Sequence, residues 1–130
     1  MNKIFMLLGI CLFCMSNNSL ASGATFTIQS EGINISVEQV VDGLGVPWGM
    51  AFLSENKVLV TEREGSIRII ELKNNKKIMV KNVPEIMAEG QGGLLDVALA
   101  PDHKTSGWLY FTYVKKINEQ CATVLARARP

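Results

Sequence analysis

The sequence predicts an all-β protein, more specifically about one and a half four-stranded blades of a β-propeller. Short segments of alternating apolar and polar residues are separated by turns of three or four polar residues, which is typical of antiparallel meanders. The pattern then restarts, because Ala51 aligns with Ala98 at an offset of 47 residues. A repeat of this period is typical of propeller blades. Two unrelated meanders that are alike by chance are the alternative interpretation.

Residues 1–21 have the features of a secretory signal peptide. Lys3 is followed by an apolar run over residues 4–15 and then by Ser19-Leu20-Ala21, a small-x-small cleavage pattern. A run of this length is too short to cross a bilayer as a helix. We therefore expect cleavage after Ala21, a periplasmic or secreted location and no membrane span.

The mature chain would carry no net charge and one cysteine. All 12 acidic residues and 12 of the 13 basic residues follow Ala21, so electrostatics give no reason to expect nucleic acid as a partner. Cys121 is the only cysteine after the signal peptide, which excludes an intrachain disulfide and a cysteine metal site in the mature chain.

The remaining chain is expected to consist of strands after a flexible start. Residues 22–32 are small, polar and weakly patterned, and predict a flexible mature N-terminus. Residues 33–41 predict a first strand, which in a complete propeller would pair with the last blade. Further strands are predicted at residues 48–53, 57–62, 66–72, 77–80, 94–100, 108–113 and 122–127. Because a propeller needs about four to eight blades to close, we expect residues 33–130 to be the N-terminal part of a domain truncated at its C-terminus.

A glycine-rich turn precedes the strand predicted at residues 94–100. Gly90, Gly92 and Gly93 surround Gln91, and glycine allows positive φ and close backbone approach. The long amide side chain of Gln91 is therefore expected to be displayed rather than packed.

Five segments carry motifs whose order and spacing are specific. They are LGVPWGMAFL at 44–53, LVTER at 59–63, VPEI at 83–86, GQGGLLDV at 90–97 and WLYFTY at 108–113. Together they resemble the soluble quinoprotein sugar dehydrogenases, the glucose/sorbosone or aldose sugar dehydrogenase family.

The resemblance implies a secreted six-bladed propeller that uses pyrroloquinoline quinone (PQQ) and calcium. It implies oxidation of the C1 hydroxyl of an aldose to a lactone, with a histidine as general base and an external electron acceptor. Gln91 matches the family glutamine whose amide hydrogen-bonds PQQ. The family's base histidine would lie beyond Pro130, so no catalytic residue and no metal ligand can be assigned here, and this chain alone is expected to be inactive.

Other chemistry-bearing residues have simpler explanations. His103 lies in a predicted turn and is interpreted as a solvated residue rather than a catalytic base. The group at residues 61–64 could suggest an acid/base site, but a solvated turn with an exposed ion pair is favoured. Asp96 could face calcium, yet accepting backbone N–H bonds in its turn is favoured.

An aromatic cluster lies on the strand predicted at residues 108–113. Its members are Trp108, Tyr110, Phe111 and Tyr113. They could stack on a sugar, but the alternation of a strand favours core packing.

Two further functions stay open at this stage, because fold alone does not determine function. One is a secreted propeller that binds a protein or glycan without catalysis. The other is a lactonase-type hydrolase with calcium at the central channel.

Overall fold

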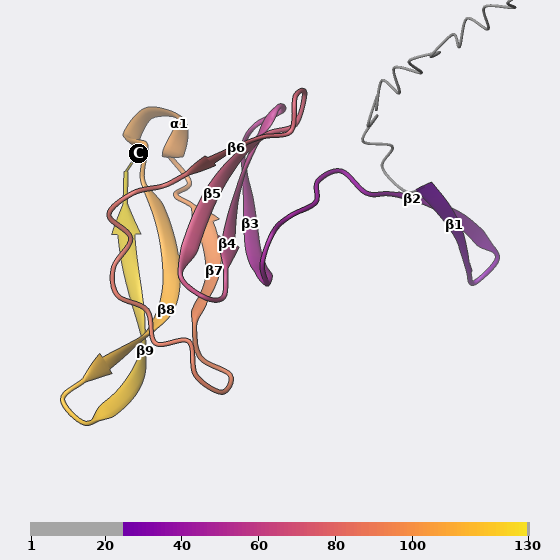
Figure 1. Ribbon diagram of the computed structural model, residues 1–130. Helices are drawn as coiled ribbons and strands as arrows, with labels where there is room; N and C mark the ends of the chain where they lie inside the picture. Colours follow the sequence, from indigo (N-terminus) through magenta and orange to yellow (C-terminus); the bar gives the residue numbers. More distant parts are fainter. Residues whose placement is uncertain (1–24, 130) are drawn as a thin grey trace, which may run out of the picture.

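A computed structural model describes residues 25–129, and these form three antiparallel sheets (Figure 1). Two of the sheets lie side by side, and a separate hairpin lies beyond them at the N-terminal end. The predicted signal peptide at residues 1–21 lies outside the described residues. The all-β prediction is confirmed.

The N-terminal hairpin consists of β1 (Thr25–Ser30) and β2 (Ile33–Glu38). Glu31 and Gly32 both have positive φ, 47° and 79°, as a two-residue type I′ turn requires. The strand β1 was not predicted, because residues 22–32 were interpreted as a flexible segment. The structure pairs β2 with β1, whereas the sequence predicts that residues 33–41 pair with the last blade of a complete propeller.

The first blade is a four-stranded meander in the order β3-β4-β5-β6. Its strands are β3 (Pro47–Ser54), β4 (Lys57–Glu62), β5 (Ser66–Glu71) and β6 (Lys76–Met79). Each predicted strand in this region is present, with ends that differ by at most one residue. Short polar turns join the strands, since β-branched residues fill the strands and glycine or asparagine allows the turns.

The second blade is represented by three strands, β7 (Leu94–Leu99), β8 (Leu109–Ile117) and β9 (Gln120–Ala128). The turn predicted between β7 and β8 contains a short helix, α1 (His103–Ser106), which Gly107 ends in the left-handed conformation. The strands β8 and β9 extend farther than predicted and form a long hairpin at the lower end of the sheet in Figure 1. The part of the chain from residue 25 to residue 129 contains no helix that could span a bilayer.

The two sheets repeat the same irregularity, which confirms the alignment found in the sequence. Pairing of β3 with β4 shifts register between Pro47 and Met50, and pairing of β7 with β8 shifts between Leu94 and Val97. Both pairs of positions are 47 residues apart. These matching bulges indicate equivalent first strands of two blades.

A threonine bridges the bulge in each blade. The Gly49 N–H donates to Thr61 Oγ1 at 2.9 Å, and the Asp96 N–H donates to Thr112 Oγ1 at 3.2 Å. The Thr61 hydroxyl also donates to the Leu95 carbonyl of the next sheet at 2.5 Å. Thr61 is fully buried, so this hydroxyl links the two blades inside the core.

The main core lies between the two sheets. It is formed by buried side chains from both, namely Leu59, Ile67, Leu94, Val97, Leu109, Phe111 and Tyr113. The first strands of the sheets, β3 and β7, contact each other directly. An ideal Cβ on Gly49 would lie 2.7 Å from Asp96 Oδ1, so glycine at position 49 permits this close approach.

The outer face of the first blade remains largely open. Trp48, Met50 and Phe52 alternate along β3 and are 48%, 66% and 56% exposed. They border an apolar groove of about 330 Å³ that also includes Val58 and Val60. A contiguous apolar surface of this kind is typical of a face that another element covers.

Candidate functional site

Gln91 belongs to the glycine turn that precedes β7, and the loop before β7 lies at the lower end of the two sheets in Figure 1. Gln91 is exposed, and within residues 25–129 no hydrogen bond to its side chain is found. The turn is closed by the Gly92 N–H, which donates to the Glu89 carbonyl at 2.7 Å. Both the donor and the acceptor of the Gln91 amide are therefore available to a ligand.

Gly93 allows the turn to lie against the first blade. Its φ is 148°, and an ideal Cβ at this position would lie 2.5 Å from the Arg63 carbonyl oxygen. No other residue type fits at this distance without movement of the backbone. The Leu94 N–H then donates to the same Arg63 carbonyl at 2.8 Å, which fixes the start of β7.

The Arg63 side chain bonds the other end of the same turn. Arg63 Nη2 donates to the Gly90 carbonyl at 2.6 Å and lies 3.4 Å from the Ala88 carbonyl. Arg63 Nη1 donates to Glu64 Oε1 at 2.8 Å in a pair whose Glu64 side chain is 61% exposed. The predicted exposed ion pair at residues 61–64 is thus present, but Arg63 also bonds the turn that carries Gln91.

The interpretation of residues 61–64 as a solvated turn is wrong for the first two of them. Thr61 is 0% exposed and Glu62 is 3% exposed. Glu62 accepts hydrogen bonds from the Gly45 N–H and, at 2.6 Å, from Arg68 Nε. The contact with Gly45 could not be predicted from local sequence because Gly45 is 17 residues away in the chain.

Burial would raise the pKa of the Glu62 carboxyl, but its hydrogen bonds to Arg68 and to Gly45 N, together with the Arg68 charge, lower that pKa below its ordinary value. Glu62 therefore stays ionised near neutral pH and has no proton to donate as a general acid. Its geometry is that of a structural anchor between the segment before β3 and the β4–β5 hairpin.

Glu62→Gln is expected to lower stability by about 1–2 kcal/mol at pH 7, because a hydrogen bond to a charged group is replaced by a neutral one. A carboxyl with a lowered folded-state pKa contributes stability above its unfolded pKa, and this contribution is lost as pH falls through the folded pKa. The difference in unfolding free energy between wild type and Glu62→Gln should therefore shrink below about pH 4. Urea unfolding of both proteins at pH 3 to 8 measures this difference. A difference that stays constant over this range would contradict the assignment of Glu62 as an ionised anchor.

Asp96 is engaged in its own turn. Its Oδ1 accepts the Val97 N–H at 2.8 Å, which agrees with the favoured interpretation of a backbone-bonding aspartate. Among residues 25–129, no group of three or more His, Cys, Asp or Glu side chains could hold a metal ion. No residue of the described part is therefore assigned to calcium.

The residues of the aromatic cluster have different surroundings. Phe111 and Tyr113 are buried and stacked, with ring centroids 5.7 Å apart, as core packing predicts. Trp108 instead contacts the guanidinium groups of Arg127 and Arg129, whose Cζ atoms lie over its ring at 4.5 and 4.3 Å from the centroid.

His103 begins α1, and α1 lies at the upper end of the sheets in Figure 1. Its Nδ1 lies 2.7 Å from the Trp108 carbonyl oxygen, so the ring links the helical turn to β8. His103 is half-buried rather than fully solvated. This structural contact explains the residue without a catalytic role.

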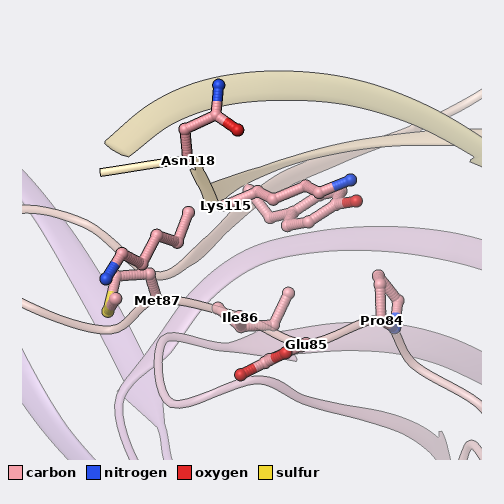
Figure 2. A pocket seen from close by; sticks show the side chains of 8 residues that line it. Pro84, Glu85, Ile86, Met87, Lys115 and Asn118 are labelled. Carbon is pink, nitrogen blue, oxygen red and sulfur yellow. The ribbon is translucent and has the colours of Figure 1, made fainter. Parts of the chain in front are cut away.

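A pocket of about 490 Å³ lies between the segment before the glycine turn and the β8–β9 hairpin. Figure 2 shows Pro84, Glu85, Ile86 and Met87 along one side of it, with Lys115 and Asn118 across from them. The Met87 N–H donates to the Val114 carbonyl at 2.9 Å, which connects the segment before the glycine turn to β8. Gln91 is not among its lining residues.

Comparison with known proteins gives a consistent result. A family model described as Glucose / Sorbosone dehydrogenase matches residues 44–130. Aldose sugar dehydrogenase YliI of Escherichia coli (strain K12) is 37% identical over 103 residues, which cover 78% of this chain and 25% of that protein. This chain spans about a quarter of the length of the curated relatives it matches.

Solved structures of similar proteins include a glucose dehydrogenase with 36% identity and a TM-score of 0.65, covering 69% of this chain and 27% of that one. The PQQ-bound form of aldose sugar dehydrogenase from Streptomyces coelicolor is 28% identical with a TM-score of 0.57, covering 81% of this chain and 28% of that one. The family model covers well over half of the residues. The chain therefore belongs to the glucose/sorbosone dehydrogenase family.

Proposed function

We propose that this chain is the N-terminal part of a PQQ-dependent aldose sugar dehydrogenase that oxidises the C1 hydroxyl of a sugar to a lactone. Family membership and the PQQ-bound relative from Streptomyces coelicolor support the proposal. The observation that carries it is the exposed amide of Gln91 on a turn fixed at both ends by the first blade.

The Gln91 turn fits a quinone cofactor in its chemistry. An exposed amide offers a donor and an acceptor to a ligand that carries carbonyls and carboxylates. The close backbone packing at Gly93 fixes the turn before the ligand arrives, which reduces the ordering cost of binding. When bound, PQQ would supply the hydride acceptor, and the role of Gln91 would be to orient it.

The rest of the proposal concerns features of the protein other than Gln91. We propose that calcium and an external electron acceptor take part, and that the base histidine lies beyond Pro130. We also propose that residues 1–21 are a cleaved signal peptide, that the protein acts in the periplasm or after secretion, and that residues 33–130 begin the propeller domain. The open apolar face on β3 supports further blades.

The proposal is tested with the full-length protein encoded by the gene that contains this chain. We expect it to bind PQQ in the presence of calcium and to reduce a redox dye with aldoses as electron donors. A protein that hydrolyses lactones without dye reduction would favour the hydrolase alternative, and one that binds neither PQQ nor substrate would favour the binding module. N-terminal sequencing of the exported protein tests cleavage after Ala21.

Gln91→Ala is expected to weaken PQQ binding about tenfold, because one or two hydrogen bonds of about 0.5–1.5 kcal/mol each are lost. Titration of the cofactor-free protein with PQQ, followed by absorbance, measures the change. Glu89→Ala is the matched control, since Glu89 is an exposed neighbour in the same turn. Equal affinities of wild type and Gln91→Ala would show that Gln91 makes no contact.

A further inference from the structure

We infer that Arg63 is a positioning residue for Gln91, a role that rests on the proposed function of that turn. Arg63 follows the end of β4 in the first blade, whereas Gln91 precedes the second blade. The guanidinium group and the carbonyl of Arg63 bond the turn on opposite sides of Gln91. Arg63 thereby fixes the direction in which the amide points without touching the ligand.

Two kinds of contact connect Arg63 to the turn. On the N-terminal side of Gln91, Nη2 donates to the Gly90 carbonyl at 2.6 Å, with the Ala88 carbonyl at 3.4 Å. On the C-terminal side, the Arg63 carbonyl accepts the Leu94 N–H at 2.8 Å. A turn with three glycines would otherwise have high conformational freedom, so these bonds select one conformation.

Arg63 is itself held firmly. Its N–H donates to the Val46 carbonyl at 2.8 Å, and its side chain is 21% exposed. Gly93 packs against its Cγ and its carbonyl, where an ideal Cβ would lie at 2.7 and 2.5 Å. Arginine suits this place because its planar group donates in several fixed directions, whereas the ammonium of lysine is a compact point charge.

The inference is tested in the full-length protein with Arg63→Met, Arg63→Lys, Gln91→Ala and the double variant Arg63→Met/Gln91→Ala. Hydrogen exchange over residues 88–94 of the cofactor-free protein reports on the turn. Absorbance titration with PQQ and calcium reports on binding. Arg68→Met is the matched control, since Arg68 lies in the same β4–β5 hairpin but bonds Glu62 instead.

We expect Arg63→Met to speed hydrogen exchange at residues 88–94 by about tenfold or more, because the guanidinium bonds to the Gly90 and Ala88 carbonyls no longer oppose local opening. PQQ binding should weaken about fivefold. In both exchange rate and PQQ affinity, Arg63→Lys should lie between Arg63→Met and wild type. The double variant should bind PQQ no more weakly than Gln91→Ala alone, because Arg63 acts through Gln91. Arg68→Met should leave exchange over residues 88–94 unchanged.

Unchanged exchange in Arg63→Met would overturn the inference. It would also be overturned if the double variant lost PQQ affinity by the product of the losses in Arg63→Met and Gln91→Ala. If Arg63→Met does not fold, the comparison of Arg63→Lys with wild type decides by the same two measurements. A wild-type protein that binds no PQQ would overturn the proposed function instead, while hydrogen exchange would still show whether Arg63 fixes the turn.

Discussion

Gly93→Ala is expected to lower the free energy of unfolding by about 2–5 kcal/mol, the sum of overpacking and backbone strain. Gly93 is buried with a φ of 148°, and the new methyl group would lie 2.5 Å from the Arg63 carbonyl oxygen. This clash can be relieved only if the backbone moves, since the Arg63 carbonyl oxygen belongs to the main chain. Urea unfolding of the variant and of wild type measures the loss.

Gly90→Ala is the control for Gly93→Ala. Gly90 lies in the same turn and also has positive φ, 53°, but an ideal Cβ there meets nothing within 4 Å. Its expected cost is therefore only the conformational one, about 1 kcal/mol. Equal losses in the two variants would contradict the close approach of Gly93 to Arg63. The shifted turn of Gly93→Ala should also bind PQQ more weakly than Gly90→Ala does.

Thr61→Val is expected to cost about 2–4 kcal/mol, because two buried backbone groups lose their partner at once. The Gly49 N–H and the Leu95 carbonyl both bond the Thr61 hydroxyl, at 2.9 and 2.5 Å. Valine has nearly the same shape, so packing is preserved and the loss reports on hydrogen bonding.

Chemical unfolding measures the cost of Thr61→Val, with Thr61→Ser as its control. Serine keeps the hydroxyl and removes one methyl group, so its expected cost is about 1 kcal/mol. If the Thr61→Val variant proves as stable as wild type, the link between the two blades through this hydroxyl is not important for stability.

The strands of both blades could be predicted because their signals are local. β-branched and apolar residues fill the segments, and Gly65, Asn75 and Asn118 adopt positive φ in the turns between them. The strand β1 was missed although Phe26 and Ile28 alternate with polar residues and Glu31-Gly32 forms a turn. All of its residues are exposed, so among residues 25–129 the pairing with β2 is the contact that organises it.

The roles of Glu62 and Arg63 could not be predicted in the same way, because a charged pair beside a glycine is typical of a solvated turn. One signal was available for Glu62. The β4–β5 hairpin pairs Val60 with Arg68 and Glu62 with Ser66, so its register places Glu62 and Arg68 diagonally on one face. Nothing comparable in the sequence indicates that Arg63 reaches the Gly90 carbonyl, 27 residues away.

The sequence by itself determined the strands, their turns and the glutamine displayed among glycines, because each depends on neighbours within a few positions. The repeat at 47 residues could be found because two such local patterns align with each other. Only the tertiary structure decided that Thr61 joins the blades, that Glu62 is a buried anchor and that Arg63 fixes the Gln91 turn. The physical reason is that a hydrogen bond depends on distance and direction in space, and packing two sheets face to face brings together groups that lie tens of residues apart.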